Sequence, residues 1–130
     1  MILDSSTIVA ILLKEDGHER LLKSLAQADE VSVGGPTAVE TGIVLTARLG
    51  VVGRTLLARF FEEVGVEIVD CGAEHWKVAV EAYERFGEGR HPAGLNFGDC
   101  LTYAVAGVAG RPLLCVGDDF SRTDVVLATA

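Results

Sequence analysis

Five acidic residues fall where apolar runs end or where helices are predicted. Asp4 closes the first apolar run of the chain, and the pair Asp118 and Asp119 follows a later one. Glu40 and Asp99 lie in predicted helices among apolar or small neighbours. Carboxylates brought together repel and raise one another's pKa values, so a cluster of them is most easily reconciled with bound cations. Oxygen sites with open positions suit Mg²⁺ or Mn²⁺, which take up phosphate oxygens.

Each acid also has a plain structural interpretation. An aspartate directly after a strand can cap the next helix, which is an open alternative for Asp4. Thr37 and Glu40 match the spacing of a capping box, and Asp99 is a first-turn acid that the helix dipole favours. However, an ionised Glu40 among apolar neighbours is costly without a cation or hydrogen-bond partners.

The elements that must position these acids alternate along the chain. Short apolar runs bounded by Gly, Pro and polar residues predict strands, and apolar residues at helical spacing predict helices. The hydroxyls of residues 5–7 are predicted to cap the first helix. The strands are predicted at 1–3, 31–33, 66–70, 113–116 and 125–127, and the helices at 8–13, 18–28, 37–49, 55–64, 73–86 and 98–108, with a loop at 87–94.

This alternation predicts an α/β fold, a three-layer α/β/α sandwich whose central, mostly parallel sheet has four to five strands. Ligands of such sheets bind beyond the carboxyl ends of the strands. Asp4 and the pair at 118–119 follow strands, so they point to that edge. The length of 130 residues predicts a single domain over residues 1–130. The chain contains neither G-x-G-x-x-G nor a Walker loop, so nucleotide cofactors are unsupported.

The charge balance restricts the partners of the chain. Its net charge of −8, from 19 acidic and 11 basic residues, argues against binding nucleic acid by bulk electrostatics. A nuclease is still compatible, because cations between carboxylates and phosphates invert the local field. The acidity also suits a basic protein partner.

The sequence predicts a cytoplasmic protein that is not associated with a membrane. No apolar stretch approaches the roughly 18 residues that a membrane span needs, and the N-terminus lacks the basic region of a secretory signal. The three cysteines show no C-x-x-C spacing. They are predicted to be reduced and to pack as small apolar residues.

Four segments, in order along nearly the whole chain, carry a family resemblance. They are MILDSST at 1–7, TAVET at 37–41, GLNFGDC at 94–100 and GDDFSRTD at 117–124, and the third is the most specific. Together they resemble the PIN-domain VapC toxins of VapBC toxin–antitoxin pairs. The resemblance implies a PIN-like fold and a magnesium-dependent endoribonuclease, with Mn²⁺ as a possible substitute. It also implies a VapB-like antitoxin, an RNA substrate, and a homodimer or toxin–antitoxin hetero-oligomer.

The resemblance places the acidic quartet of the family on Asp4, Glu40, Asp99 and one member of the pair at 118–119. Asp119 is favoured because it directly precedes Phe120, which matches an Asp-Phe pattern of the family, although the doublet leaves this register open. Asp4 and Asp99 are then the main metal ligands. Glu40 and Asp119 bind the metal directly, through water or at a second ion.

Further residues are candidates for contacts with the metal or the RNA. Ser6 matches a hydroxyl residue that the family places near the metal. Asn96 either orients the neighbouring acid and a water or caps its loop. Arg85, Arg90 and His91 precede the most specific segment and are the candidates for flanking RNA phosphates, with ordinary solvated charges as the alternative for each.

Other classes of protein fit less well. A haloacid-dehalogenase phosphatase needs a second aspartate where this chain has Ser6, and a receiver domain with Asp70 as phosphoacceptor needs a later lysine, yet none follows Lys77. The alternatives to the nuclease are another phosphatase-like, metal-dependent hydrolase and a non-enzymatic α/β binding module, in which the acids are unrelated caps. Trp76 and Tyr83, seven residues apart, are predicted to be core residues rather than stacking platforms for bases.

Overall fold

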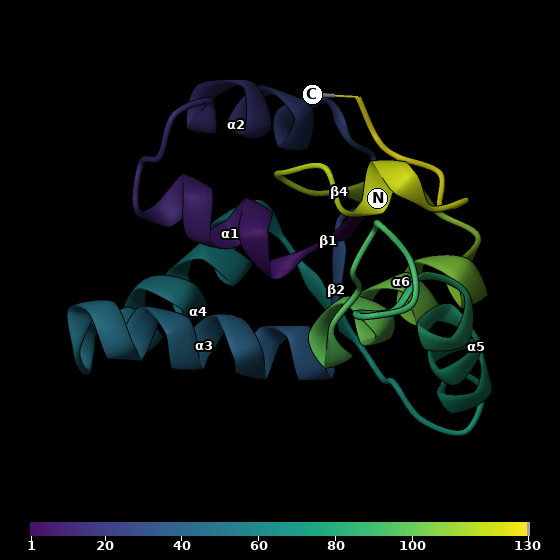
Figure 1. Ribbon diagram of the computed structural model, residues 1–130. Helices are drawn as coiled ribbons and strands as arrows, with labels where there is room; N and C mark the ends of the chain where they lie inside the picture. Colours follow the sequence, from purple (N-terminus) through teal and green to yellow (C-terminus); the bar gives the residue numbers. More distant parts are fainter. Residues whose placement is uncertain (130) are drawn as a thin grey trace.

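A parallel sheet lies at the centre of the computed structural model, which describes residues 1–129 (Figure 1). Within those residues the sheet has four strands in the order β3-β2-β1-β4, and all its strand pairs are parallel. Ala130, the end of the domain expected at 1–130, lies outside the described residues. The strands are β1 (Ile2–Leu3), β2 (Ser32–Gly34), β3 (Glu67–Val69) and β4 (Leu113–Leu114).

Helices cover both faces of this sheet, which confirms the predicted three-layer α/β/α sandwich. Figure 1 shows one group of helices on one side of the sheet and a second group on the other. The first group is α1 (Ser5–Leu12), α2 (His18–Gln27), α3 (Gly35–Leu49) and α4 (Val52–Val64); the second is α5 (Trp76–Phe86) and α6 (Phe97–Ala109), and a short 3₁₀ helix, η1 (Phe120–Arg122), follows β4.

The central strands fill two hydrophobic cores because successive side chains of a strand point to opposite faces. Ile2 and Leu113 pack with α5 and α6, whereas Leu3 and Leu114 pack with α1 to α4. Each strand therefore needs only a few buried residues to hold both helical layers. The carboxyl end of β1 opens between these layers, and Asp4 follows it directly.

Two predicted element boundaries differ from the structure. The helix predicted from 55 begins at Val52, because Gly53 lies against α3: a Cβ at this position would come within 2.6 Å of the backbone carbon of Leu45. The strand predicted at 125–127 is reduced to one bridge between Leu113 and Leu127. That segment meets β4 at a single residue, through hydrogen bonds of 2.9 and 2.8 Å on the two sides of Leu113.

The prediction that Trp76 and Tyr83 are core residues is wrong. Their exposed fractions are 58% and 44%. The face of α5 that packs into the core is instead formed by Ala79, Ala82 and Phe86. Small alanines let α5 approach α6 closely, and the two larger aromatics lie at the margin of this contact.

The cysteines agree with the prediction of reduced thiols. Cys100 is buried, Cys71 and Cys115 are half-buried, and all three are free. Among the helices of residues 1–129, none combines the length and the apolar character that crossing a membrane would require.

Candidate active site

Asp4 lies in the centre of the sheet edge, where β1 ends between β2 and β4. Its side chain is buried, at 6% exposure, and it is the N-cap of α1. The hydroxyls of residues 5–7 were expected in that role, and this expectation is wrong. Thr7, for example, donates its hydroxyl to the carbonyl of Leu114 at 2.7 Å. The cap is therefore built from the first candidate acid.

Ser6 holds this aspartate in place. One carboxylate oxygen of Asp4 accepts hydrogen bonds from the backbone N–H of Ser6 at 3.1 Å and from its hydroxyl at 2.6 Å. The Ser6 hydroxyl in turn accepts the backbone N–H of Val116 at 3.0 Å. The hydroxyl thus joins the ends of β1 and β4. In this structure Ser6 supports Asp4, and its predicted contact with metal or substrate stays a prediction.

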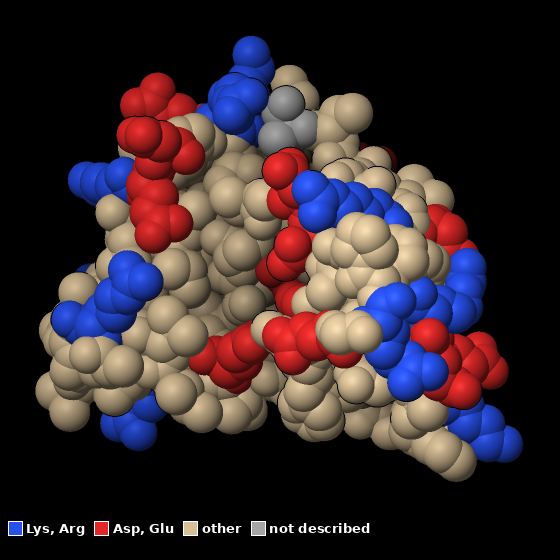
Figure 2. Space-filling view, viewed as in Figure 1, with Lys and Arg blue, Asp and Glu red and all other residues tan. Residues whose placement is uncertain are grey.

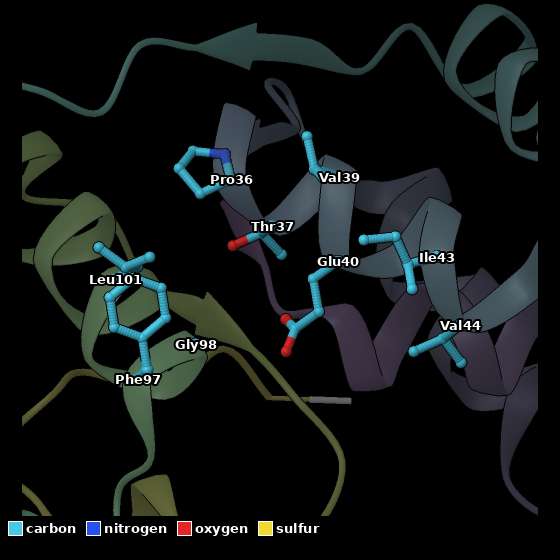
Figure 3. A pocket seen from close by; sticks show the side chains of 9 residues that line it. All are labelled: Pro36, Thr37, Val39, Glu40, Ile43, Val44, Phe97, Gly98 and Leu101. Atoms are coloured by element: carbon cyan, nitrogen blue, oxygen red, sulfur yellow. The ribbon is translucent and has the colours of Figure 1, made fainter.

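Glu40 projects from α3 without the predicted capping box. The helix begins two residues before Thr37, with Gly34 as its N-cap, because Pro36 suits the first turn. The Thr37 hydroxyl lies inside the fold, 3.1 Å from the Thr102 hydroxyl of α6. The carboxylate of Glu40 is therefore not engaged by Thr37. It points into the space between α3 and α6, toward Gly98 (Figure 3).

Gly98 makes room for this carboxylate and was not singled out as a site residue by its sequence. A Cβ on Gly98 would lie 2.6 Å from Oε2 of Glu40, which is closer than real Cβ contacts. A side chain at position 98 would therefore displace the end of the Glu40 side chain from its present place. The position of Gly98 directly before a candidate acid is the one signal in the sequence, and it does not indicate which side chain Gly98 contacts.

Asp99 is fixed at the start of α6 by a capping box with Asn96. The Asn96 side chain accepts the backbone N–H of Asp99 at 2.9 Å, and the Asp99 carboxylate accepts the backbone N–H of Asn96 at 3.1 Å. The two alternatives for Asn96 are thus compatible, since the cap also orients the acid. Asp99 is half-buried, at the same sheet edge as Asp4.

The pKa of Asp99 depends on the other candidate acids. The pKa of Asp99 is raised to about 6, mainly by burial and in smaller part by the carboxylates of Asp4, Asp119 and Glu40, against a lowering effect of the backbone hydrogen bond from Asn96. The carboxylates of Asp4, Glu40 and Asp119, which come from three other parts of the chain, therefore lie close enough to act on Asp99. The assignment of these four acids to one metal site stays a prediction.

The two acids of the doublet after β4 differ in their effect on Asp99. Asp119 directly precedes η1, whose first residue, Phe120, is buried at 3% exposure. Asp119 is among the groups that raise the pKa of Asp99, whereas Asp118 is not among them. Asp118 instead accepts the hydroxyl of Ser121 through its backbone carbonyl at 2.7 Å. This difference supports Asp119 as the fourth acid, and the assignment stays a prediction.

The arrangement fits a hydrated cation rather than a cation enclosed by protein ligands. Within residues 1–129, no three His, Cys, Asp or Glu side chains form a group that could hold a metal ion. Mg²⁺ commonly uses one or two carboxylates and keeps several waters, so a looser carboxylate cluster suits it. Burial raises the pKa of the neighbouring Cys115 to about 11. Without a metal this thiol is therefore protonated, and Mg²⁺ prefers carboxylate oxygens as ligands.

The basic residues predicted to contact RNA make contacts within the protein. Arg85 pairs with Asp124 at 3.0 Å. Arg90 donates to the carbonyl of Glu84 at 3.4 Å. The Nδ1 atom of His91 accepts the backbone N–H of Ala93 at 3.0 Å, so these contacts give each predicted residue a role in the fold.

Arg122 is a basic residue near the acids that the sequence indicated only as part of the segment 117–124. It lies three residues after Asp119, and its guanidinium donates to the carbonyl of Pro92 at 3.1 Å. Neither of the two ion pairs found within residues 1–129 includes it. Figure 2 shows acidic side chains following the hollow across the middle of this face, with basic side chains beside it.

Comparison with protein families and relatives agrees with this geometry. A family model described as the PIN domain matches residues 1–126. "VapC ribonuclease Mb2004c" of Mycobacterium bovis is 45% identical over 126 residues, which cover 96% of this chain and 91% of the relative. "Ribonuclease VapC" of Mycolicibacterium smegmatis is 40% identical over 125 residues, covering 96% and 97%. The chain therefore belongs to the PIN-domain family, among its VapC proteins, which confirms the resemblance.

Solved structures show the same fold. Mycobacterium tuberculosis VapC20, described as a "Sarcin-Ricin loop cleaving toxin", matches with a TM-score of 0.80 at 21% identity, covering 99% of this chain and 98% of that one. VapBC2 from Rickettsia felis, bound to a DNA fragment from the promoter, matches with a TM-score of 0.77 at 17% identity, covering 98% and 96%. At these identities the likeness concerns the fold alone.

Proposed function

We propose that this chain is the toxin of a toxin–antitoxin pair and acts as a metal-dependent endoribonuclease. The relatives that carry the name VapC ribonuclease support the reaction class. The observation that carries the proposal is the convergence of four carboxylates, since Asp4, Glu40 and Asp119 all raise the pKa of Asp99. Unrelated helix caps would have no reason to act on one another in this way.

The reaction would be an in-line displacement at an RNA phosphodiester. PIN-domain VapC nucleases generally depend on a divalent metal, and the proposed ion here is Mg²⁺, with Mn²⁺ as its substitute. When bound, the ion supplies an activated water and neutralises charge on the phosphate oxygens. Asp4 and Asp99 would hold it, and Glu40 and Asp119 would bind its waters or a second ion.

The residues of the chain itself prepare this site before any ligand arrives. Ser6 fixes one oxygen of Asp4, and Asn96 fixes Asp99 through the capping box. Ligands that are already oriented lose less conformational freedom on binding. Arg122, three residues after Asp119, is the basic side chain that we assign to a flanking phosphate.

Partners of two kinds are part of the proposal. A VapB-like antitoxin would place a basic side chain among the acids and block the site, because the chain has a net charge of −8. A second copy of the chain would dock through an uncharged face, because two copies that each carry a net charge of −8 repel one another where their charged faces meet. An apolar surface on α3, α5 and α6 is suitable; its exposed residues are Val39, Ile43, Trp76, Val80 and Phe97.

The assembly can be tested by sedimentation of the purified chain. Ile43→Asp would place a charge in the apolar surface, and we expect it to convert a dimer into monomers without unfolding. A matched change on another exposed position, Val126→Asp, is expected to leave the dimer intact. A wild-type chain that sediments as a monomer at all concentrations contradicts the dimer.

The nuclease is tested by replacing carboxylates with amides of the same shape. Asp4→Asn and Asp99→Asn are each expected to lower metal-dependent RNA cleavage by more than about 100-fold, with the circular dichroism spectrum retained. Asp29→Asn is the control, because this exposed acid precedes β2 and so lies at the opposite edge of the sheet. Full cleavage by either site variant contradicts the assignment. Absence of metal binding by the wild type favours a non-enzymatic binding module.

A further inference from the structure

Asp119 lies on a segment that has little regular structure of its own. Between β4 and the bridge at Leu127 there is only the three-residue η1. Asp119 makes no capping hydrogen bond with its own side chain. Something outside this segment must therefore determine where its carboxylate lies relative to the other acids.

Asp124 ties the segment to the second helical layer. The hydroxyl of Tyr103, on α6, donates to one carboxylate oxygen of Asp124 at 2.5 Å, and the guanidinium of Arg85, on α5, donates to the other at 3.0 Å. We call these three residues the Asp124 clamp. Both of its bonds have a charged partner, and such bonds are shorter and stronger than those between neutral groups.

The clamp has a fixed relation to the acidic cluster. Tyr103 follows Asp99 by four residues on α6, so both side chains lie on one face of that helix, one turn apart. On the other side of the clamp, Asp124 follows Asp119 by five residues, with the buried Phe120 between them. Helix α6 thus carries one candidate ligand directly and holds the segment of another through its next turn.

We propose that Asp124 is a positioning residue, which through Tyr103 and Arg85 places Asp119 opposite Asp99 for cation binding. The inference rests on the proposed function, because it concerns the same acidic site. It changes the role of Arg85 from a contact with RNA phosphates to a structural partner of Asp124. It also explains why a segment with so few backbone hydrogen bonds can carry a ligand.

The first test measures Mn²⁺ binding by isothermal titration calorimetry on the full chain. Asp124→Asn removes the charge at nearly constant size, and Tyr103→Phe removes only the hydroxyl. Each is expected to weaken Mn²⁺ binding about 10-fold, as changes in outer-shell partners of metal ligands do. Arg48→Gln is the matched control. It breaks the other exposed ion pair, Arg48–Glu15 at 4.0 Å, and is expected to leave the affinity unchanged.

The second test needs no metal. Amide hydrogen exchange of residues 117–123 is expected to speed up several-fold in Asp124→Asn and Tyr103→Phe, while residues 2–12 keep the wild-type rate. Ultraviolet titration gives a signature of the contact itself. Burial and then Asp124 raise the pKa of Tyr103 to about 12, so Asp124→Asn is expected to lower it. Tyr103→Phe identifies the signal against that of Tyr83.

The outcomes distinguish the proposed function from the positioning role of Asp124. Wild-type chain that binds no Mn²⁺ overturns the proposed function, and the positioning role with it. Wild type that binds Mn²⁺ while both clamp variants keep its affinity overturns the positioning role alone, whatever the exchange rates. Should Asp124→Asn fail to fold, Tyr103→Phe decides, since it removes a single oxygen at a half-buried position.

Discussion

Two of the four acids are fixed locally, and two are positioned by distant parts of the chain. Asp4 caps the helix that it precedes, and Asp99 forms a capping box with a residue three positions earlier. Their orientations follow from hydrogen bonds within a few residues. The hydrogen bonds that begin α1 and α6 therefore also orient Asp4 and Asp99.

Glu40 and Asp119 contrast with that pair. The position of Glu40 depends on Gly98 of another helix, and Asp119 lies on the segment that contains buried Phe120 and the clamped Asp124. Local and distant anchoring therefore meet in one site. The difference teaches that an acid can be oriented by the helix end that it caps, whereas an acid inside a helix or on an irregular segment needs tertiary contacts of its own.

Among changes that leave all four acids in place, the largest expected effect comes from breaking a distant contact. Gly98→Ala puts a methyl group 2.6 Å from Oε2 of Glu40, so the carboxylate must move. We expect RNA cleavage to fall about 100-fold, within the range that displaced metal-site groups show. Steady-state cleavage of a labelled single-stranded RNA would measure it.

Gly107→Ala on the same helix is the matched control for that change. A Cβ there meets only Val78 Cγ1 at 3.9 Å, and alanine is favoured over glycine in helices by about 0.5–1 kcal/mol. It is expected to keep full activity and to raise the melting temperature. Equal activity of the two variants would show that Glu40 is not constrained by Gly98.

A local anchor is broken by Ser6→Ala. The change removes the 2.6 Å hydrogen bond to Asp4 and the acceptor for Val116 N–H. We expect Mn²⁺ affinity to fall about 10-fold, because the backbone N–H of Ser6 still holds the carboxylate. Calorimetry would measure this, with Ser24→Ala as the hydroxyl control, because the Ser24 hydroxyl on α2 donates to the carbonyl of Thr129 and touches none of the four acids. An unchanged affinity would show that the Ser6 hydroxyl does not support metal binding and serves either a contact with substrate or the start of α1.

The next smaller effect concerns the stability of the apo chain. The folded-state pKa of Asp99 is raised to about 6, so below pH 4 both states are protonated, and stability is lost as pH rises through 6. Asp99→Asn removes this loss. At pH 7 and without metal, we expect it to be more stable by about 1 kcal/mol after allowance for solvent screening. Denaturant unfolding at pH 4 and pH 7 would measure it, and a gap that persists at pH 4 contradicts the assigned cause.

The smallest effect is expected for Arg122, the basic residue that follows Asp119 by three positions. If Arg122 contacts one phosphate, Arg122→Gln lowers the salt slope of single-stranded RNA binding by about 0.7. Arg90→Gln is expected to leave that slope unchanged, because the Arg90 guanidinium lies over the Tyr83 ring, 5.7 Å from its centroid, and bonds the carbonyl of Glu84, so that α5 holds it on both sides. Fluorescence anisotropy at several salt concentrations would compare them. A smaller slope in Arg90→Gln alone would restore the role first predicted for that residue.

The sequence predicts the features that depend on local contacts and misses those that depend on distant contacts. The sheet, the helical layers and the edge at Asp4 are predicted, because strand and helix patterns are local. The capping box predicted at Thr37 is wrong, because Pro36 lets α3 start earlier and Thr37 pairs with Thr102 instead. Nothing in the spacing of Glu40 indicates its contact with Gly98, which depends on how two helices cross.

The sequence does not predict the contacts of Arg85 and of residues 125–127, because they depend on distant parts of the chain. Arg85 is an exposed cation by sequence, and only the fold brings Asp124 and Tyr103 to it. A strand pattern at 125–127 is likewise reduced to one bridge, because the segment meets β4 at Leu113 only. Contacts between residues so distant in the chain leave no periodic signal.

The central claim is that four carboxylates share one cation site. The most direct measurement is a Mn²⁺ titration by calorimetry of the wild type and of Asp4→Asn, Glu40→Gln, Asp99→Asn and Asp119→Asn, with Asp29→Asn as control. We predict that each of the four variants binds at least about 10-fold more weakly, while the control binds like the wild type. A wild type without Mn²⁺ binding, or four variants with wild-type affinity, would contradict the account.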